Sequence, residues 1–264
     1  MGMKKLSFDA FTLKIIAIVS MGVHHTLMVL WELFPVWLHV PLYATRGITF
    51  PIMAFFVTEG FRRTSNINRY MLRLLIFGSI AQIPYMLASG IYMLNIIFTI
   101  LLGLIIIATH DRLCVKAQKR GLFVLILIVL LIASLFIVEG GLFGPLMIFL
   151  FHVIKDEKKR RTYPLICWGA MLIFSNLFAR LSFYLDEAAF ANVQGGIMQL
   201  EVLMMHYYVF SIGSFAIIPL LRAYNGERGR RAKFLFYAFY PIHWVVLAVL
   251  AYALGVADFS FIGL

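Results

Sequence analysis

The first apolar stretch of the chain contains three ionisable side chains at helical spacing. Lys14 and His25 are eleven residues apart, and His24 directly precedes His25. Eleven residues make about three helical turns, so Lys14 and His25 share one face, with His25 roughly 16 Å further along the axis. A titratable group inside a membrane segment is costly, and an imidazole suits proton transfer near neutral pH. We therefore predict His25 as a general base supported by His24 and Lys14, with a polar helix-packing contact as the alternative.

Further charged residues follow at one end of the next two apolar stretches. Glu59 ends the second stretch and is followed by Arg62 and Arg63. It is expected to form an interfacial salt bridge, or to orient a catalytic histidine or a cofactor-binding arginine. Arg73 opens the third stretch, and with Arg62 and Arg63 it forms a basic patch. Guanidinium groups bind phosphate through paired hydrogen bonds, so the patch is a candidate phosphate site, with anchoring at the membrane surface as the alternative.

Polar residues also occur deeper in the apolar segments. Asn95 and Thr99 are four residues apart and lie on one helix face, which favours an interhelical hydrogen-bonding pair. Together with Arg46 they are candidates to stabilise an oxyanion. Pro241 interrupts the last apolar segment two residues before His243, and such breaks often line a cavity. His243 is therefore a candidate second base, or a residue that orients the acceptor.

Composition identifies the elements that must position these residues. The chain is 62% hydrophobic and 13% charged, whereas soluble domains are about 45–50% apolar and about 25% charged. We predict an all-α, polytopic transmembrane bundle forming a single domain over residues 1–264. Nine apolar segments are expected to be spans: 13–33, 46–61, 72–90, 95–110, 121–138, 142–154, 163–180, 202–221 and 233–254. The segment 142–154 is short for a full crossing, and 183–201 is expected to be a connecting loop, with an interfacial helix or a lid as the alternative.

The basic residues predict the orientation of these spans. All 23 lysines and arginines fall into five clusters, apart from Lys14, Arg46 and Arg180, and two apolar stretches separate each cluster from the next. The positive-inside rule then places the amino terminus in the cytoplasm and the carboxyl terminus outside. The net charge of +11 is explained by anionic lipid headgroups rather than by nucleic acid. The two cysteines and seven histidines show no zinc-ligand spacing, so no metal is expected.

Six sequence motifs, taken in order, resemble the TraX family of integral membrane acetyltransferases. They are LKIIAIVSMGVHH at 13–25, RGITFPIMAFFVTEGF at 46–61, YMLRLLIF at 70–77, IPY at 83–85, NIIFTILLG at 95–103 and FYPIH at 239–243. The spacing of Lys14 and His25 is also similar to that of the first helix of the wider acyltransferase-3 group. The family usually has an Asp-His pair where this chain has His24 and His25. Glu59 or His24 is then expected to replace the aspartate.

The resemblance implies a multi-pass protein of the bacterial cell membrane that uses acetyl-CoA as a cytoplasmic donor. The implied cofactor-binding residues are Arg62, Arg63, Arg73, Arg46, Asn95, Thr99 and Tyr85. The family activity is amino-terminal acetylation of conjugative pilin, and a glycan hydroxyl or a small amine are alternative acceptors. Two other functions are compatible with the sequence: a transporter or flippase, and a non-catalytic membrane component of a conjugation or secretion system.

Overall fold

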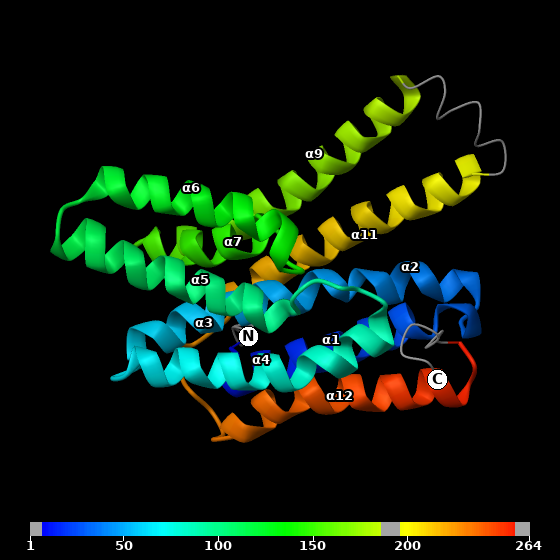
Figure 1. The fold of residues 1–264 in the computed structure, drawn as a ribbon, viewed down its shortest axis with the longest axis horizontal. Coiled ribbons are helices and arrows are strands. Elements are labelled where there is room, and N and C mark those ends of the chain that lie inside the picture. The colour runs from blue at the N-terminus through cyan, green and yellow to red at the C-terminus, as the bar shows by residue number, and fades with distance from the viewer. Residues whose placement is uncertain (1–6, 186–195, 257–264) are drawn as a thin grey trace, which may run out of the picture.

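The computed structural model describes residues 7–185 and 196–256 (Figure 1). Within these ranges all secondary-structure elements are helices, and no strand is present. Two isolated β-bridges occur, between Phe8 and Tyr224 and between Leu94 and Val138. The all-α prediction is therefore confirmed. The elements are α1 (Ala10–Val29), η1 (Trp31–Leu33), α2 (Val36–Ala44), α3 (Arg46–Arg63), α4 (Ile67–Ser89), α5 (Ile96–His110), η2 (Asp111–Lys116), α6 (Arg120–Ile137), α7 (Phe143–Val153), α8 (Glu157–Arg160), α9 (Tyr163–Leu185), α11 (Gly196–Arg222) and α12 (Lys233–Ala253).

Each of the nine predicted segments contains a helix, but fewer are long and apolar enough to cross a membrane. Among the described residues six helices meet both conditions: Ala10–Val29, Trp37–Arg63, Ile67–Ser89, Ile96–Val115, Arg120–Ile137 and Phe234–Ala253. The helix α7 has 11 residues, and a full crossing takes about 20. The chain is thus a polytopic membrane protein, and six helices in its described part are both long and apolar enough to span a membrane, where the sequence predicted nine spans.

The connection between the first two predicted spans is a second difference. The interval 34–45 was expected to be a loop, but most of it forms α2, which continues into α3 after Thr45 alone. Pro35 stands directly before α2 with extended backbone angles, a place that a helix start tolerates because no intrahelical N–H bond is lost. The predicted loop 183–201 falls partly on 186–195, outside the described residues, and α11 has already begun at Gly196.

Packing brings helices from both halves of the chain around a common core. The helix α12 packs on α4 and α1, α5 packs on α7 and α4, and α11 packs on α9 and α3. At the crossing of α3 and α11, a Cβ on Gly47 would collide with the backbone of Ser214, and one on Gly213 with the backbone of Ala44. Glycine at both positions therefore lets the two backbones touch, as small residues commonly do between membrane helices.

The basic residues gather at one end of this bundle. The turns from α3 to α4, from α5 to α6 and from α11 to α12 lie on the left of Figure 1, opposite the start of α2 and the end of α12. These turns hold three of the five basic clusters, including Arg62, Arg63 and Arg228. Three of the clusters from which the topology was predicted therefore lie together at one end of the bundle in the structure. The cytoplasmic placement of this end stays a prediction.

Candidate functional site

A cavity of about 750 Å³ runs through the middle of the bundle. Its volume is within the range of about 300–1,000 Å³ typical of ligand pockets. Five cations from four different segments line its mouth, and we call them the basic rim: Lys14, Arg63, Arg73, Arg228 and Arg230. Four polar residues line its other end, and we call them the inner end: His24, His25, Arg46 and Glu139.

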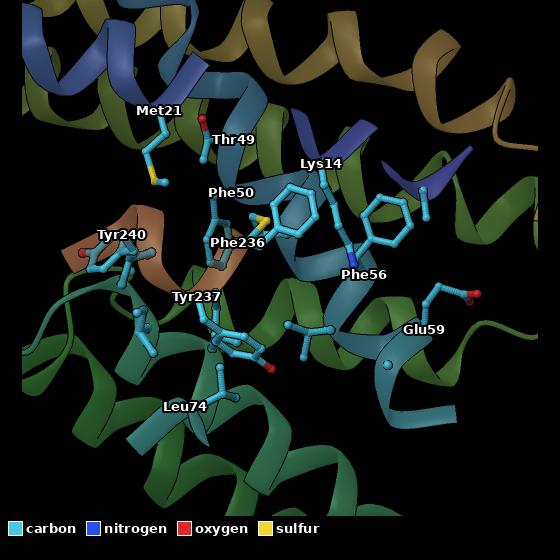
Figure 2. A pocket seen from close by; sticks show the side chains of 18 of the residues that line it. Lys14, Met21, Thr49, Phe50, Phe56, Glu59, Leu74, Phe236, Tyr237 and Tyr240 are labelled. Atoms are coloured by element: carbon cyan, nitrogen blue, oxygen red, sulfur yellow. The ribbon is translucent and has the colours of Figure 1, made fainter. Parts of the chain in front are cut away.

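Aromatic side chains form the walls between the two ends. Figure 2 shows Glu59 toward one side of the cavity and Tyr240 toward the other, with the rings of Phe56, Phe236 and Tyr237 between them. The cavity therefore joins two groups of polar residues through an apolar passage. Lys14 and His25, which the sequence spacing places on one helix face, both line this cavity, and so does His24.

His25 makes its closest polar contact with a histidine from the last helix. Its Nδ1 lies 2.7 Å from Nε2 of His243, and Nδ1 of His243 lies 3.0 Å from the carbonyl oxygen of Phe239. A carbonyl oxygen only accepts, so Nδ1 of His243 carries the proton and its Nε2 accepts from the N–H of His25. The lone pair of neutral His25 then lies on Nε2. This is the tautomer that a general base at the cavity needs.

Ring contacts hold His25 in place. The indole of Trp244 stacks on it with centroids 4.3 Å apart, and Trp244 is itself fully buried. Tyr85 meets Trp244 edge to face at 5.1 Å. Tyr85 was predicted to bind the cofactor, but it is absent from the cavity lining and instead supports the ring behind His25. The orienting partner of His25 is thus a residue 218 positions away, rather than Glu59 or His24.

The inner end also places opposite charges near the histidines. Arg46 donates through Nη1 to the hydroxyl of Tyr43 at 2.8 Å, and the ring of His24 meets Tyr43 edge to face at 5.5 Å. Glu139 follows α6 and lines the same end. Burial raises the pKa of Glu139, while the charge of Arg46 opposes that shift. Glu139 was not among the candidate residues chosen from the sequence, so its approach to the cavity was missed.

Two cations of the basic rim, Arg73 and Lys14, have no salt bridge to a carboxylate among the described residues. Nε of Arg73 is buried and has no hydrogen-bond partner among the described residues. Lys14 lies 5.0 Å from the ring centroid of Phe56 and 5.5 Å from that of Phe236. No carboxylate of the described chain comes within 4.0 Å of its amine. Such groups suit a ligand that carries several negative charges.

The loop after α11 brings two more arginines to the rim. Its backbone is hydrogen-bonded to the start of α1. The N–H groups of Phe8 and Ala10 donate to the backbone carbonyl oxygens of Ala223 and Glu227, each at 2.9 Å. Gly229 has a φ of 64°, and a Cβ there would collide with the carboxylate of Asp9. These contacts hold Arg228 and Arg230 at the cavity mouth. Sequence reasoning counted both only as topology signals, since no local motif marks them.

Glu59 lies at the rim and binds arginines. Its Oε1 accepts from Nη2 of Arg160 at 2.7 Å, and its Oε2 accepts from Arg63 at 3.0 Å. Arg160 is only 1% exposed, and it also donates to the hydroxyl of Thr58, to the carbonyl of Phe151 and to both carboxylate oxygens of Glu157. The predicted salt bridge of Glu59 is present, and one of its partners, Arg63, is among the arginines predicted to bind the cofactor. Glu59 therefore orients the guanidinium of Arg63 at the rim.

Three other predicted cofactor residues lie outside the cavity lining. Arg62 is directed to Glu157, at 3.3 Å, on the exposed surface. Asn95 caps α5, where its side chain accepts from the N–H of Ile97 and donates to the oxygens of Gly78 and Gln82. These contacts confirm the interhelical hydrogen bonding predicted for Asn95, and both the nitrogen and the oxygen of its amide have partners.

Thr99 is likewise occupied. Its hydroxyl accepts from the N–H of Gly140 at 3.1 Å, which ties α5 to the turn that carries Glu139. Among the three predicted oxyanion candidates, Arg46 alone lines the cavity.

Comparisons with known proteins identify the family of the chain. No solved structure matches the chain. A probable fimbrial assembly protein, FimC of serogroup H1 from Dichelobacter nodosus, is 26% identical over 266 residues, which covers 92% of this chain and 96% of the relative. The family described as TraX protein matches residues 10–251. Because that match covers nearly the whole chain, the protein belongs to the TraX family.

Proposed function

We propose that the protein is an integral membrane acetyltransferase that uses acetyl-CoA at the cytoplasmic face of the bacterial plasma membrane. One observation carries the proposal: a single cavity joins a cationic rim to a histidine whose tautomer suits a general base. The donor has a polyanionic nucleotide end and a long neutral arm that ends in a thioester. Its two ends match the two ends of the cavity in charge and polarity.

The rim residues fit the phosphates of this donor. The buried, unpartnered Nε of Arg73 and the free amine of Lys14 are groups that a phosphate oxygen would satisfy. Glu59 holds the guanidinium of Arg63 in position without neutralising the other cations. The aromatic passage then receives the uncharged arm and excludes water from the inner end.

The bound thioester supplies an activated acetyl carbonyl. An amine or hydroxyl acceptor gives its proton to Nε2 of His25, and its lone pair forms the new bond to the carbonyl carbon. The carbon–sulfur bond breaks, and His25 returns the proton to the departing thiolate. His243 accepts the Nδ1–H bond of His25 throughout and stabilises the imidazolium. Arg46 is the residue we assign to the developing oxyanion.

The test is acetyl transfer by purified protein in lipid nanodiscs. Labelled acetyl-CoA is added with envelope extract, and free CoA thiol and labelled acceptor are measured. His25→Ala should abolish both signals. His39→Ala is the matched control, because His39 is buried against the carbonyl of Phe34 outside the cavity lining. Full transfer by a folded His25→Ala protein would remove the basis of the proposal.

A second function is favoured by the name of the relative. That protein is described as a probable fimbrial assembly protein, which suggests a non-catalytic membrane component for pilus or fimbria assembly. Under this alternative, His25→Ala supports normal fimbria assembly in a deletion strain and no acetyl-CoA binding is detected. Under the enzymatic proposal, the same variant leaves the acceptor unacetylated while the wild-type protein modifies it.

A further inference from the structure

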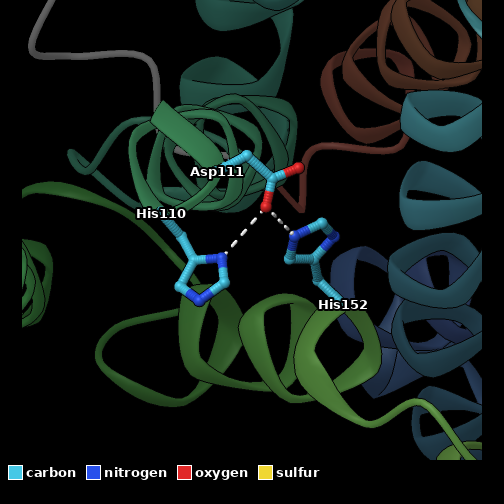
Figure 3. Close-up of side chains that lie close together, drawn as sticks. All are labelled: His110, Asp111 and His152. Carbon is cyan, nitrogen blue, oxygen red and sulfur yellow. Dashed lines mark hydrogen bonds and ion pairs between the residues drawn. The ribbon is translucent and has the colours of Figure 1, made fainter. Parts of the chain in front are cut away.

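A second cluster of functional side chains lies outside the cavity lining, where α5 and α7 meet. Asp111 Oδ1 is 3.0 Å from Nδ1 of His110 and 2.7 Å from Nε2 of His152 (Figure 3). The three possible ligand atoms all lie within 4.8 Å of one another. His152 is 41 residues away from Asp111 in sequence, so the grouping depends on the fold.

Local backbone geometry contributes to this grouping. The α-helical hydrogen bonding of α5 ends at His110 and changes to a π-helix over Asp111–Lys116. Short π-helical turns occur often at functional sites. The helix α7 packs on α5 and brings His152, one residue before its end, to the same point. Two neighbouring residues of one helix and one residue of another therefore face a shared centre.

The rings are held by more than the aspartate. His110 meets Phe123 edge to face at 5.2 Å and Phe149 at 5.5 Å. His152 meets Phe61 in the same way at 5.3 Å. The imidazoles are thus oriented by apolar neighbours, a form of preorganisation that a metal site requires.

We propose that His110, Asp111 and His152 form a binding site for a first-row divalent metal ion, with Zn²⁺ as the expected occupant. Two imidazole nitrogens and one carboxylate oxygen are a ligand set that proteins use for zinc, with water in the remaining position. Tetrahedral zinc with bonds of about 2.0–2.2 Å places its ligand atoms about 3.3 Å apart, so Oδ1 of Asp111 and Nε2 of His152, now 2.7 Å apart, must separate to admit the ion. When the ion binds, each neutral imidazole carries its proton on its other ring nitrogen, and the nitrogen that donated to the carboxylate offers its lone pair to the ion.

The position of the site indicates what a bound ion does. Nη2 of Arg62 donates to the backbone carbonyl of His152 at 3.4 Å, and Phe61 packs on the imidazole ring of His152. Both residues belong to the end of α3, next to Glu59 and Arg63 of the cavity mouth. An ion at this site cross-links α5 and α7 and, through His152, braces the end of α3. The positive charge of Arg62 opposes cation binding, so the ligand carboxylate is essential.

The test uses untagged full-length protein, stripped with a chelator and titrated with zinc chloride in lipid nanodiscs. The wild-type protein should bind one zinc ion and show a higher Tm when loaded. Asp111→Asn should weaken zinc binding about tenfold or more while retaining an oxygen that accepts the two imidazole N–H bonds. His152→Gln should weaken it similarly, and X-ray absorption of the wild-type site should show nitrogen and oxygen ligands.

Matched controls exclude other sources of metal binding. His39→Ala and Cys114→Ser should bind zinc like the wild-type protein, because neither residue belongs to the cluster. Unchanged zinc affinity in both Asp111→Asn and His152→Gln would overturn the proposal. Absence of zinc binding by folded wild-type protein would do the same and leave Asp111 as a hydrogen-bond acceptor between two helices.

Discussion

The contact between His25 and His243 allows a quantitative prediction. In His243→Ala, the Nδ1–H of His25 loses an acceptor that lies 2.7 Å away in a buried site. An unsatisfied buried donor costs about 1–3 kcal/mol. If the transition state bears this cost in full, kcat falls about 5- to 150-fold, since about 1.36 kcal/mol corresponds to a factor of ten. The proton of His25 is also free to move to Nε2, which removes the reactive lone pair.

The assay is the initial rate of CoA release at several acetyl-CoA concentrations. The KM for acetyl-CoA should stay close to the wild-type value, because the basic rim is roughly 16 Å of helix away from His25. His243→Gln should recover much of the activity, since its amide oxygen can replace Nε2 as acceptor. Wild-type kcat in folded His243→Ala, or a change confined to KM, would refute the tautomer argument.

Three further predictions concern the rim, the α5 cap and the basic end. Arg73→Ala should raise the KM for acetyl-CoA about tenfold or more, whereas exposed Arg69→Ala should not; equal effects in kinetic titrations would argue against a phosphate site. Asn95→Ala should lower the free energy of unfolding by about 1–3 kcal/mol without changing KM, and an unchanged Tm in the same detergent would contradict the capping role. Burial raises the pKa of Glu157, but neighbouring arginines, Arg160 foremost, outweigh it and hold that pKa below 4.5. The ionised form therefore stabilises the fold above its unfolded pKa, and this contribution is lost as pH falls through the folded pKa. Acidification should lower the Tm of the wild-type protein more than that of Glu157→Gln, and parallel curves would contradict this.

The parts predicted well from sequence depend on local patterns. Apolar length located every long helix of the described chain, and the three-turn spacing placed Lys14 and His25 on one cavity wall. The helix α2 was missed because its residues fell between the predicted spans 13–33 and 46–61, where no element was predicted. Helix propensity alone does not show that a short helix such as α2 will run almost without a break into the helix that follows it.

The parts that could not be predicted depend on which helices become neighbours. Glu59 pairs with Arg160 from a segment 101 residues away, and His25 finds its orienting partner 218 residues away. Neither distance leaves a periodic signal in the sequence. Asn95 illustrates the opposite case: its type suggested chemistry, but its amide oxygen accepts from the N–H of Ile97 at the start of α5. Its amide nitrogen donates to the oxygens of Gly78 and Gln82 in α4.

The most direct measurement of the central claim is a cryo-EM structure of the protein in nanodiscs with a non-hydrolysable acetyl-CoA analogue. We expect density for the phosphates beside Arg73 and Arg228 at the basic rim. The acetyl carbonyl carbon should lie close enough to His25 for an amine or hydroxyl that is hydrogen-bonded to Nε2 of His25 to attack it. An empty cavity at saturating analogue, or an analogue bound with its phosphates away from the basic rim, would contradict the account.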